Sequence, residues 1–226
     1  MSREMDRIPE PELMDDPAQA FAYARADFEQ PHNEFIVQFR QRFPDWPGRG
    51  CVLDLGCGPG DICRRFAQAF PAIHVHGVDG AAAMLAIGRD DLHAARLTDR
   101  VQLHRGYLPG AVLPRERYDA VLSNSLLHHL DAPQALWQAI LQHAAPGAPV
   151  FVMDLRRPDS RARAVELVER YADGEPALLR TDFHNSLLAA YRTEEIEAQL
   201  RVAGLDWLQV QALSDRHLLV SGQRPE

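Results

Sequence analysis

The chain has 226 residues, of which 46% are hydrophobic and 25% charged, a balance typical of a globular protein rather than a disordered or fibrous one. Its length suits one α/β domain and is too short for two domains of typical size. Asp and Glu outnumber Lys and Arg by 32 to 24, and the net charge of −8 disfavours a nucleic-acid partner, because nucleic-acid backbones are polyanions.

The N-terminal part of the chain predicts only helices. The opening residues, MSREMDRIPEPELMDD, lack the apolar core and cleavage site of a signal peptide, and no apolar run approaches the ~20 residues of a membrane span. We therefore expect a cytoplasmic protein with no membrane partner. Apolar residues recur at helical spacing in 17–28 and again in 31–43. Residues 1–48 are expected to form a helical lid on a main domain at 49–226.

From residue 51 onward, short apolar runs alternate with helical patterns, which is typical of a parallel sheet with crossover helices. Strands are expected at 51–55, 73–79, 101–105, 118–123 and 150–155. Helices are expected between them at 62–70, 81–97 and 133–144.

The C-terminal part predicts one more helix and a hairpin. A helix is expected at 193–203, with acidic residues in its first turn, followed by strands at 205–212 and 217–221. The short link LSDR between these strands favours an antiparallel hairpin. Residues 156–192 are more chain than a crossover needs, and we interpret them as an insertion over the active face of the sheet.

The stretch VLDLGCGPGDI, residues 52–62, predicts a ligand-binding turn. Asp54 lies in a strand, and glycines at 56, 58 and 60 follow where the backbone must turn sharply and approach a ligand. Asp79 ends the next expected strand, where a carboxylate accepts hydrogen bonds from ribose hydroxyls. Together the two features indicate an adenosyl-type ligand, although a tight turn with no ligand is an alternative for the glycines alone.

A dinucleotide is the competing ligand class for this turn. A dinucleotide site requires G-x-G-x-x-G, whereas position 61 is Asp, an anion where a pyrophosphate would sit. This argues against NAD and against a nicotinamide oxidoreductase. The three cysteines, Cys51, Cys57 and Cys63, match no zinc-site spacing, so we expect reduced structural thiols and no metal site.

The turn resembles motif I of the class I S-adenosylmethionine-dependent methyltransferases. VDGAAAML (78–85) is similar to motif II, YDAVLSNSLLHHL (118–130) to motif IV, and APGAPVFVMDLRRP (145–158) to the fifth-strand motif. The resemblance covers roughly residues 50–157. It implies an α/β fold with a Rossmann-like, mostly parallel sheet of seven strands, the last antiparallel, and helices on both faces. It also implies S-adenosyl-L-methionine as cofactor.

The resemblance carries cofactor roles onto matching positions. The acid and glycines of motif I border the methionine moiety, Asp79 holds the ribose, and Met84 contacts the adenine edge. After the third strand the family often has Gly-Asp-Ala, whereas this chain has Gly106-Tyr107-Leu108, so Tyr107 either borders the adenine ring or packs in the loop. The expected cofactor-binding residues are Asp54, Gly56, Cys57, Gly58, Gly60, Asp79, Gly80, Met84, Gly106, Tyr107, Asn124 and Ser125.

Methyl transfer is an in-line displacement that needs an aligned nucleophile and, for some acceptors, a base. His128 and Asp154 are the expected catalytic residues, although a histidine here could instead satisfy a loop carbonyl. The polar cluster in TDFHNSLLAAY (181–191) lines a pocket wall or caps a helix through Asp182 or Ser186. The expected substrate-binding residues are Tyr23, Asp27, His32, His129, Arg156, Arg157 and Asn185.

These patterns predict transfer of a methyl group to an O, N, S or C nucleophile of a small metabolite. The arginine pair at 156 and 157 makes an anionic acceptor plausible, because guanidinium groups bind carboxylates and phosphates. Alternatives are a protein or RNA acceptor and a non-catalytic module that only binds the cofactor. A homodimer is compatible with the sequence.

Overall fold

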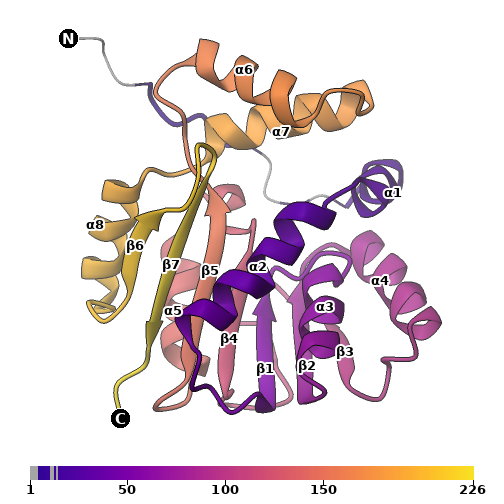
Figure 1. Cartoon of the computed structure of the whole chain (residues 1–226), viewed down its shortest axis with the longest axis vertical. Coiled ribbons are helices and arrows are strands. Elements are labelled where there is room, and N and C mark those ends of the chain that lie inside the picture. The colour runs from indigo at the N-terminus through magenta and orange to yellow at the C-terminus, as the bar shows by residue number, and fades with distance from the viewer. Residues whose placement is uncertain (1–4, 11–12, 14) are drawn as a thin grey trace.

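The computed structural model describes residues 5–10, 13 and 15–226, and it contains one seven-stranded sheet (Figure 1). The strand order is β3-β2-β1-β4-β5-β7-β6. The strands are β1 (Arg49–Leu55), β2 (Ala72–Asp79), β3 (Val101–Arg105), β4 (Ala120–Asn124), β5 (Pro149–Leu155), β6 (Gln209–Ala212) and β7 (His217–Gln223). The predicted α/β fold class is confirmed.

The first five strands run parallel, and β7 is antiparallel to both β5 and β6. The carboxyl ends of β1 to β5 therefore meet at one edge of the sheet. β1 has β2 on one side and β4 on the other, so the chain reverses its direction of progress across the sheet at this point. In open α/β sheets such a reversal leaves a crevice at the carboxyl ends of the strands.

Helices cover both faces of the sheet and its carboxyl edge (Figure 1). One face packs against α2, α3 and α4, and the other against α5 and α8. α6 and α7 lie beyond the upper ends of the strands. The helices are α1 (Pro17–Arg25), α2 (Glu29–Arg42), α3 (Asp61–Ala69), α4 (Ala82–Ala94), α5 (Gln134–His143), α6 (Arg161–Tyr171), α7 (Ala177–Ala189) and α8 (Thr193–Ala203), with a 3₁₀ turn, η1 (Leu127–His129).

The second N-terminal helix belongs to the core. Phe35 and Phe39 of α2 are fully buried, and the Phe39 ring packs edge-on against Phe66 and Phe151 with centroid separations of 4.8 and 5.6 Å. Burying two phenylalanine side chains contributes several kcal/mol, roughly 2–3 kcal/mol each. α2 is therefore fixed to the sheet.

The expected insertion at 156–192 is a helix pair with its own apolar contacts. Leu167 and Val168 of α6 pack against Leu187 and Leu188 of α7. α7 begins at Ala177, directly after Pro176, whose fixed φ suits the residue before a first helical turn. The capping role considered for Asp182 and Ser186 is therefore wrong, because both lie inside the helix.

The other differences from the expected elements are small and local. The strand expected at 205–212 begins only at Gln209, because Leu205 is buried in a turn that follows the left-handed Gly204. The long crossover helix ends at Ala94 instead of 97. Within the described residues, no helix is long and apolar enough to cross a membrane.

Gly88 marks the closest approach of α4 to the chain after β1. A Cβ atom on Gly88 would stand 2.5 Å from the carbonyl oxygen of Pro59, which is backbone and cannot rotate away. We expect Gly88→Ala to lower the free energy of unfolding by roughly 1–2 kcal/mol in urea titrations, although alanine is the better helix former by about 1 kcal/mol. Asp90→Ala, on the exposed face of the same helix, is the control. A Gly88→Ala variant as stable as the control would contradict this packing.

Candidate functional site

The glycine turn after β1 has the backbone that its sequence predicts. Gly56, Gly58 and Gly60 have φ angles of 71°, 51° and 75°, in the left-handed region that favours glycine. Gly60 is the residue before α3, so the turn leads directly into the N-terminus of that helix. The turn therefore brings the chain along the crevice between β1 and β4, with the N–H groups of Gly56 and Cys57 held by the Val78 carbonyl oxygen.

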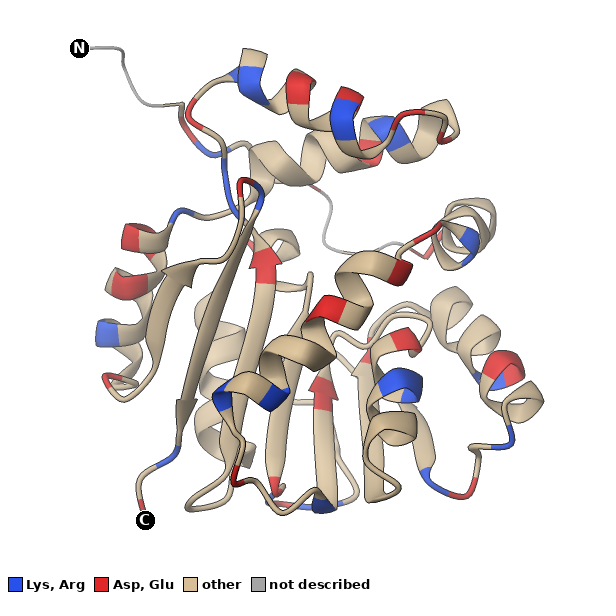
Figure 2. Ribbon diagram, in the orientation of Figure 1, with Lys and Arg blue, Asp and Glu red and all other residues tan. Residues whose placement is uncertain are grey.

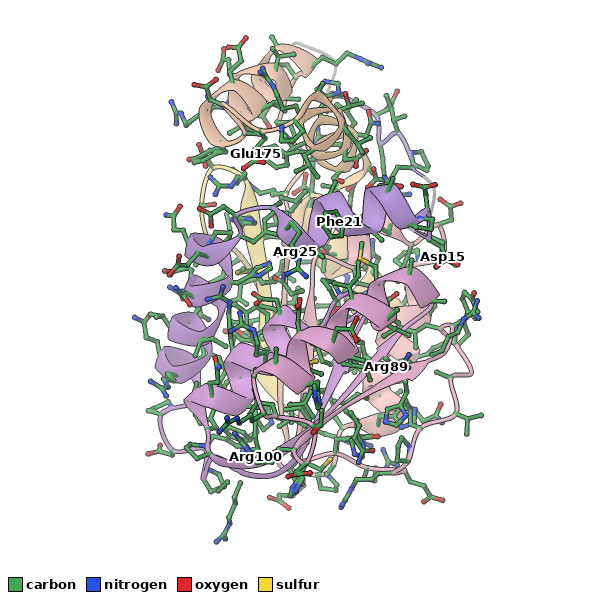
Figure 3. The ribbon with its side chains drawn as sticks, turned by 90° about the vertical axis from the view of Figure 1, so that its right-hand side faces the viewer. Asp15, Phe21, Arg25, Arg89, Arg100 and Glu175 are labelled. Atoms are coloured by element: carbon green, nitrogen blue, oxygen red, sulfur yellow. The ribbon has the colours of Figure 1, made fainter. Side chains whose placement is uncertain are left out.

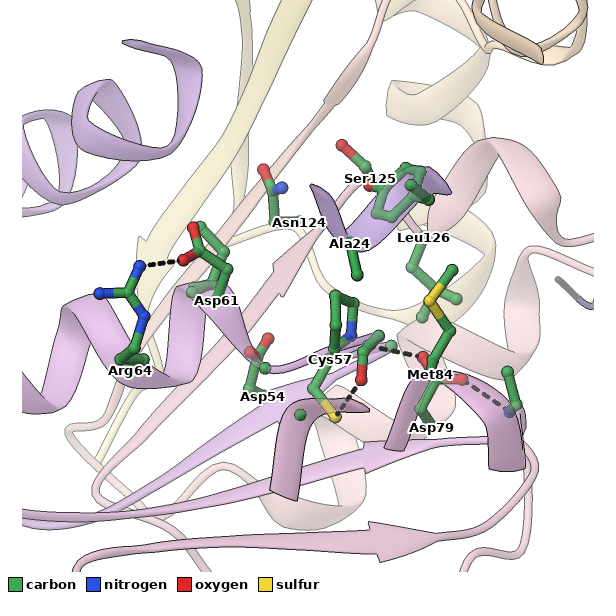
Figure 4. A pocket seen from close by; sticks show the side chains of 18 of the residues that line it. Ala24, Asp54, Cys57, Asp61, Arg64, Asp79, Met84, Asn124, Ser125 and Leu126 are labelled. Atoms are coloured by element: carbon green, nitrogen blue, oxygen red, sulfur yellow. Dashed lines mark hydrogen bonds and ion pairs between the residues drawn. The ribbon is translucent and has the colours of Figure 1, made fainter. Parts of the chain in front are cut away.

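Asp79, at the end of β2, ties the neighbouring strand to this turn. Its Oδ2 accepts a hydrogen bond of 2.8 Å from the Gly58 N–H, and its Oδ1 accepts one of 2.8 Å from the Ala81 N–H (Figure 4). Burial raises the pKa of Asp79 although both hydrogen bonds act in the opposite direction. The carboxylate holds the turn and still borders the cavity.

Asp54 presents an unsatisfied acceptor to the same cavity. The side chain is buried, and its Oδ2 accepts a hydrogen bond of 3.0 Å from the Cys63 thiol. Oδ1 has no hydrogen-bond partner among the residues that the structure describes. Burial raises the pKa of Asp54 to about 7, with a further contribution from the Asp79 charge. A buried carboxylate oxygen of this kind fits a cationic hydrogen-bond donor.

Asp61, the first residue of α3, fixes α2 against the glycine turn. Its carboxylate accepts hydrogen bonds from His32 Nδ1 (2.7 Å), Arg65 Nε (2.6 Å) and the Arg64 guanidinium (Figure 4). Burial opposes ionisation, but these hydrogen bonds hold the pKa of Asp61 well below its ordinary value. The group therefore carries a fixed negative charge at the helix N-terminus. This is the position at which the sequence analysis argued against a pyrophosphate.

The turn and the strand ends enclose a cavity of about 740 Å³, within the usual size range of small-molecule sites. The sequence-predicted cofactor residues come from five separate segments, and the structure brings all of them together here. Lining the cavity are Asp54, Gly56, Cys57, Gly58, Gly60, Asp79, Gly80, Met84, Gly106, Tyr107, Asn124 and Ser125.

Tyr107 lies at the rim of this cavity. Its side chain is 55% exposed, and its hydroxyl oxygen accepts a hydrogen bond of 3.3 Å from Arg105. A Cβ atom on Gly80 would stand 2.7 Å from the Tyr107 ring, so the ring lies directly on that glycine. The position is compatible with a ring bordering a bound nucleobase.

α1 covers the cavity and is attached to α4. Asp15 Oδ1, just before α1, accepts a hydrogen bond of 3.0 Å from the Ala83 N–H, and Arg25 pairs with Asp91 at 3.2 Å. Figure 3 shows Asp15 and Arg25 near the two ends of this helix. Between these two contacts, Ala20 packs in an apolar cluster with Ala81 and Met84, and Gln19 donates a hydrogen bond of 3.1 Å to Asp182 on α7.

A second cavity of about 590 Å³ opens between α1 and α2 and the α6–α7 pair. Both cavities are lined by Tyr23, Asp27, His32, Asn124 and Ser125, among others, so they share a wall. The sequence-predicted residues His128 and His129 also line the second cavity. Its volume is within the usual range of small-molecule sites, so it could hold a second small molecule beside the first cavity.

His128 and Asp154 form a buried pair beside the second cavity. His128 is 2% exposed, and its Nδ1 lies 2.6 Å from Asp154 Oδ1. Asp154 also accepts hydrogen bonds of 2.7 Å from the backbone N–H groups of Leu127 and Leu155. Burial lowers the pKa of His128, but the Asp154 charge and hydrogen bond outweigh it, so that the pKa is raised.

The pair has the geometry of a base and the group that orients it. Asp154 fixes one ring nitrogen of His128 and leaves Nε2 directed away from it. Asp154 itself is not among the described residues that line either cavity. Its oxygens are engaged by His128 and by backbone N–H groups, so the expected catalytic role of Asp154 would act through His128.

Glu10, which the sequence analysis did not select, completes this cluster. Its Oε1 accepts a hydrogen bond of 2.9 Å from Ser186 and lies 3.6 Å from His128 Nε2 and 3.2 Å from His129 Nδ1. The three ligand atoms of Glu10, His128 and His129 lie within 4.8 Å of one another, close enough for a metal ion. In this structure Glu10 is joined to Ser186 by a hydrogen bond and to the two histidines by ion-pair contacts. No periodicity or motif around residue 10 signals this role.

The arginines expected to bind an acceptor lie elsewhere. Arg157 is 3% exposed and donates to the carbonyls of Met5 (3.1 Å) and Ala190 (2.9 Å) and to Glu195 (2.5 Å). Arg156 Nη2 lies 3.5 Å from the Ser214 carbonyl oxygen. Neither residue is among the described residues that line a cavity, and exposed Asn185 is not either. The backbone here pairs with the chain just after α7, because the Arg157 N–H donates to the Tyr191 carbonyl oxygen at 3.3 Å.

Several lining residues were missed by sequence reasoning. Phe28 ends the apolar pattern at 17–28, which predicts helix packing and not a cavity wall, and Glu175 lies in the connection between α6 and α7, which has no periodicity. Asp182 and Ser186, four residues apart on α7, both line the second cavity, in agreement with the pocket-wall alternative for 181–191. Recognising Pro176 as the start of that helix would have placed both on one face.

A family model described as a methyltransferase domain matches residues 52–147. Among curated proteins, the chain is 32% identical to a trans-aconitate 2-methyltransferase of Delftia acidovorans over 119 residues, covering 53% of this chain and 42% of that protein. It is 29% identical to the N,N-dimethyltransferase OxyT of Streptomyces rimosus over 173 residues, covering 75% of this chain and 48% of that protein. The chain spans about half the length of the curated relatives it matches.

Solved structures share the fold at low sequence identity. A SAM-dependent methyltransferase from Aquifex aeolicus superposes with a TM-score of 0.66 at 17% identity, covering 92% of this chain and 98% of that one. A phosphoethanolamine N-methyltransferase from Haemonchus contortus gives a TM-score of 0.70 at 15% identity over 93% of this chain and 58% of that one. The family-model match therefore identifies a methyltransferase domain at residues 52–147, and the motifs and strand order described above are those of the class I S-adenosylmethionine-dependent fold.

Proposed function

We propose that this protein transfers a methyl group from S-adenosylmethionine to an O, N, S or C nucleophile of a small molecule. The observation that carries the proposal is the pair of cavities with a shared wall at the carboxyl ends of the strands. One has the residues of a donor site, and the other contains the buried His128–Asp154 pair. Two adjoining cavities let donor and acceptor meet in line.

The residues of the first cavity fit the donor. Asp79 can accept from ribose hydroxyls, the unsatisfied Oδ1 of Asp54 suits the ammonium of the methionine moiety, and Met84 and Tyr107 border the place for adenine. When bound, S-adenosylmethionine supplies a methyl group on a positively charged sulfur, which makes that carbon electrophilic. The ionised Asp61, with the carboxyl groups of Asp54 and Asp79 beside it, favours this cationic ligand over a dinucleotide.

The residues of the second cavity would hold and activate the acceptor. His128 Nε2 would take a proton from a nucleophile that must lose one, and Asp154 would orient the ring and stabilise its charged form. Asp154 is then a positioning residue. Tyr23, Asp27, His32 and His129 would contact the acceptor, and α1 with the α6–α7 pair would exclude water.

The open volume of the second cavity supports catalysis over a module that only binds the cofactor. The name of one relative describes a methyltransferase for trans-aconitate, which is a small molecule, and this supports a small acceptor; another relative is named an N,N-dimethyltransferase. A protein or RNA acceptor is the alternative. A lid role for residues 1–48, a cytoplasmic location and a homodimer stay predictions from the sequence.

The decisive test is a metabolite-extract screen with isotope-labelled S-adenosylmethionine and the full chain. The proposal expects a labelled small molecule in the product fraction, and its identification gives both the acceptor and the methylated atom. Label found only in protein or RNA would support the alternative acceptor classes. Binding of S-adenosylhomocysteine without any labelled product would favour the non-catalytic module.

Asp79→Ala is expected to weaken binding of S-adenosylhomocysteine by about 10- to 100-fold, corresponding to roughly 1–3 kcal/mol, through loss of charged hydrogen bonds. Isothermal titration calorimetry measures this directly. Asp119→Ala is the matched control, because Asp119 also accepts from a backbone N–H, that of Cys51 at 2.7 Å, but at the opposite end of β1. Equal affinity in the two variants would contradict the role of Asp79.

The raised pKa of Asp54 predicts that the affinity for S-adenosylhomocysteine depends on pH. Its pKa is about 7 without ligand, so part of the population must release a proton when an ammonium binds beside it. Affinity for S-adenosylhomocysteine should therefore increase from about pH 6 to about pH 8, because above pH 7 the proton has already left. Calorimetry in buffers of different ionisation enthalpy should detect the released proton, and Asp54→Asn should abolish it. A flat pH profile in the unsubstituted protein would argue against this contact.

Asp154→Asn is expected to lower kcat by about 100-fold, within the usual range for general-base catalysis, without changing affinity for S-adenosylhomocysteine. Loss of the Asp154 charge lowers the pKa of His128, and the base is active when neutral, so the acid limb of the pH–rate profile should move to lower pH. A purely structural role would lower the amount of folded enzyme but leave that limb in place.

A further inference from the structure

The second cavity is lined by carboxylates that are not paired with cations. Asp27 and Glu29 come from the start of α2, and Glu175 and Asp182 from the α6–α7 pair. In the part of the chain that the structure describes, none of these four carboxylates forms an ion pair. Figure 2 shows acidic residues in the loop between α6 and α7, and Figure 3 shows Glu175 on the side of that pair nearest α1.

The histidines of this cavity are already engaged by carboxylates. His128 lies between Asp154, at 2.6 Å, and Glu10, at 3.6 Å, and His129 lies 3.2 Å from the same Glu10 oxygen. His32 is held by Asp61. A protonated imidazole in any of these positions is balanced by a carboxylate of the protein, so an anionic ligand would meet no free positive charge there.

Arg216 is the arginine among the described lining residues, and it is also engaged. Its guanidinium lies 3.3 Å from the centre of the Tyr171 ring, and burial lowers its pKa. The neighbouring His217 is neutral near pH 7, because burial lowers its pKa to about 4. The cavity therefore has a negative electrostatic balance.

Aromatic rings complete the lining on the side of α1 and α2. Tyr23 and Phe28 pack with centroids 4.8 Å apart, and Phe28 stacks on His32 at 5.3 Å. All three line the second cavity. Aromatic faces attract organic cations through the negative potential above the ring, and carboxylates nearby add to this attraction.

From the unpaired carboxylates, the engaged cations and the aromatic wall, we infer that the acceptor is an amine with an apolar portion, bound as an ammonium and methylated on nitrogen. The inference rests on the proposed function and replaces the anionic acceptor suggested by Arg156 and Arg157. In the reaction the ammonium gives one proton to His128 Nε2, and the nitrogen lone pair forms the bond to the methyl carbon. The carbon–sulfur bond breaks with its electron pair moving to sulfur, which yields the methylated ammonium and S-adenosylhomocysteine.

A binding experiment tests the charge preference independently of turnover. The full chain, saturated with S-adenosylhomocysteine, is titrated with benzyltrimethylammonium, phenylacetate and benzyl alcohol, a cation, an anion and a neutral molecule of similar size. We expect the cation to bind at least tenfold more tightly than either of the others. Equal binding of the three probes, or preference for phenylacetate, would overturn the inference.

Paired variants locate the binding site. The double variant Glu175→Gln/Asp182→Asn should bind benzyltrimethylammonium about three- to tenfold more weakly, because two carboxylates of the cavity lose their charge. Glu169→Gln/Asp159→Asn removes the same charge from exposed positions outside the cavity and is the matched control. A similar loss of affinity in both double variants would mean that binding depends only on the net charge of the protein. It would contradict the assignment of the cation site to the second cavity.

Turnover with labelled donor separates this inference from the proposed function. Incubation with benzylamine should give labelled N-methylbenzylamine, and the cavity double variant should raise KM more than it changes kcat. Labelled methyl phenylacetate from phenylacetate would support methyl transfer but overturn the amine inference. Tight binding of benzyltrimethylammonium with no labelled product from benzylamine or from any extract component would support the cation site and overturn the proposed function.

Discussion

The hydrogen bonds of Asp79 are the interaction on which the donor site depends. One carboxylate joins the end of β2 to Gly58 in the turn after β1 and to Ala81 at the start of α4. The turn after β1 and the β2–α4 connection, which are distant in sequence, therefore have a common reference point at the carboxyl edge of the sheet. The left-handed glycines make the turn sterically possible, but the carboxylate selects its position. Gly88 of α4 packs closely against the Pro59 carbonyl and so supports the same turn.

Features encoded locally were predictable from the sequence. The apolar runs predicted the parallel strands, because strands buried on both faces are continuously hydrophobic in sequence. The glycine spacing predicted the turn, because few other residues adopt a left-handed backbone. The residues expected to bind the cofactor could be selected because strand ends in this topology converge on one crevice. All of them border one cavity in the structure.

Features that depend on contacts between distant segments were not predictable. Arg157 follows β5 directly, where residues usually face the crevice, but it donates to the carbonyls of Met5 and Ala190. Glu10 comes from a segment without periodicity, and only the folded chain brings it to His128. The polarity of the acceptor cavity likewise arises from α2 and the α6–α7 connection, which carry no shared motif.

The helix pair α6 and α7 has an apolar cluster of its own, separate from the two clusters that flank the sheet. Substitutions within the pair, or its exchange for a different insertion, would therefore leave the packing of the sheet largely intact. The residues proposed to bind the donor lie at the strand ends, in the connections that follow them and on α4, outside this pair. Evolution could thus change the compound that is methylated without rebuilding the machinery that provides the methyl group.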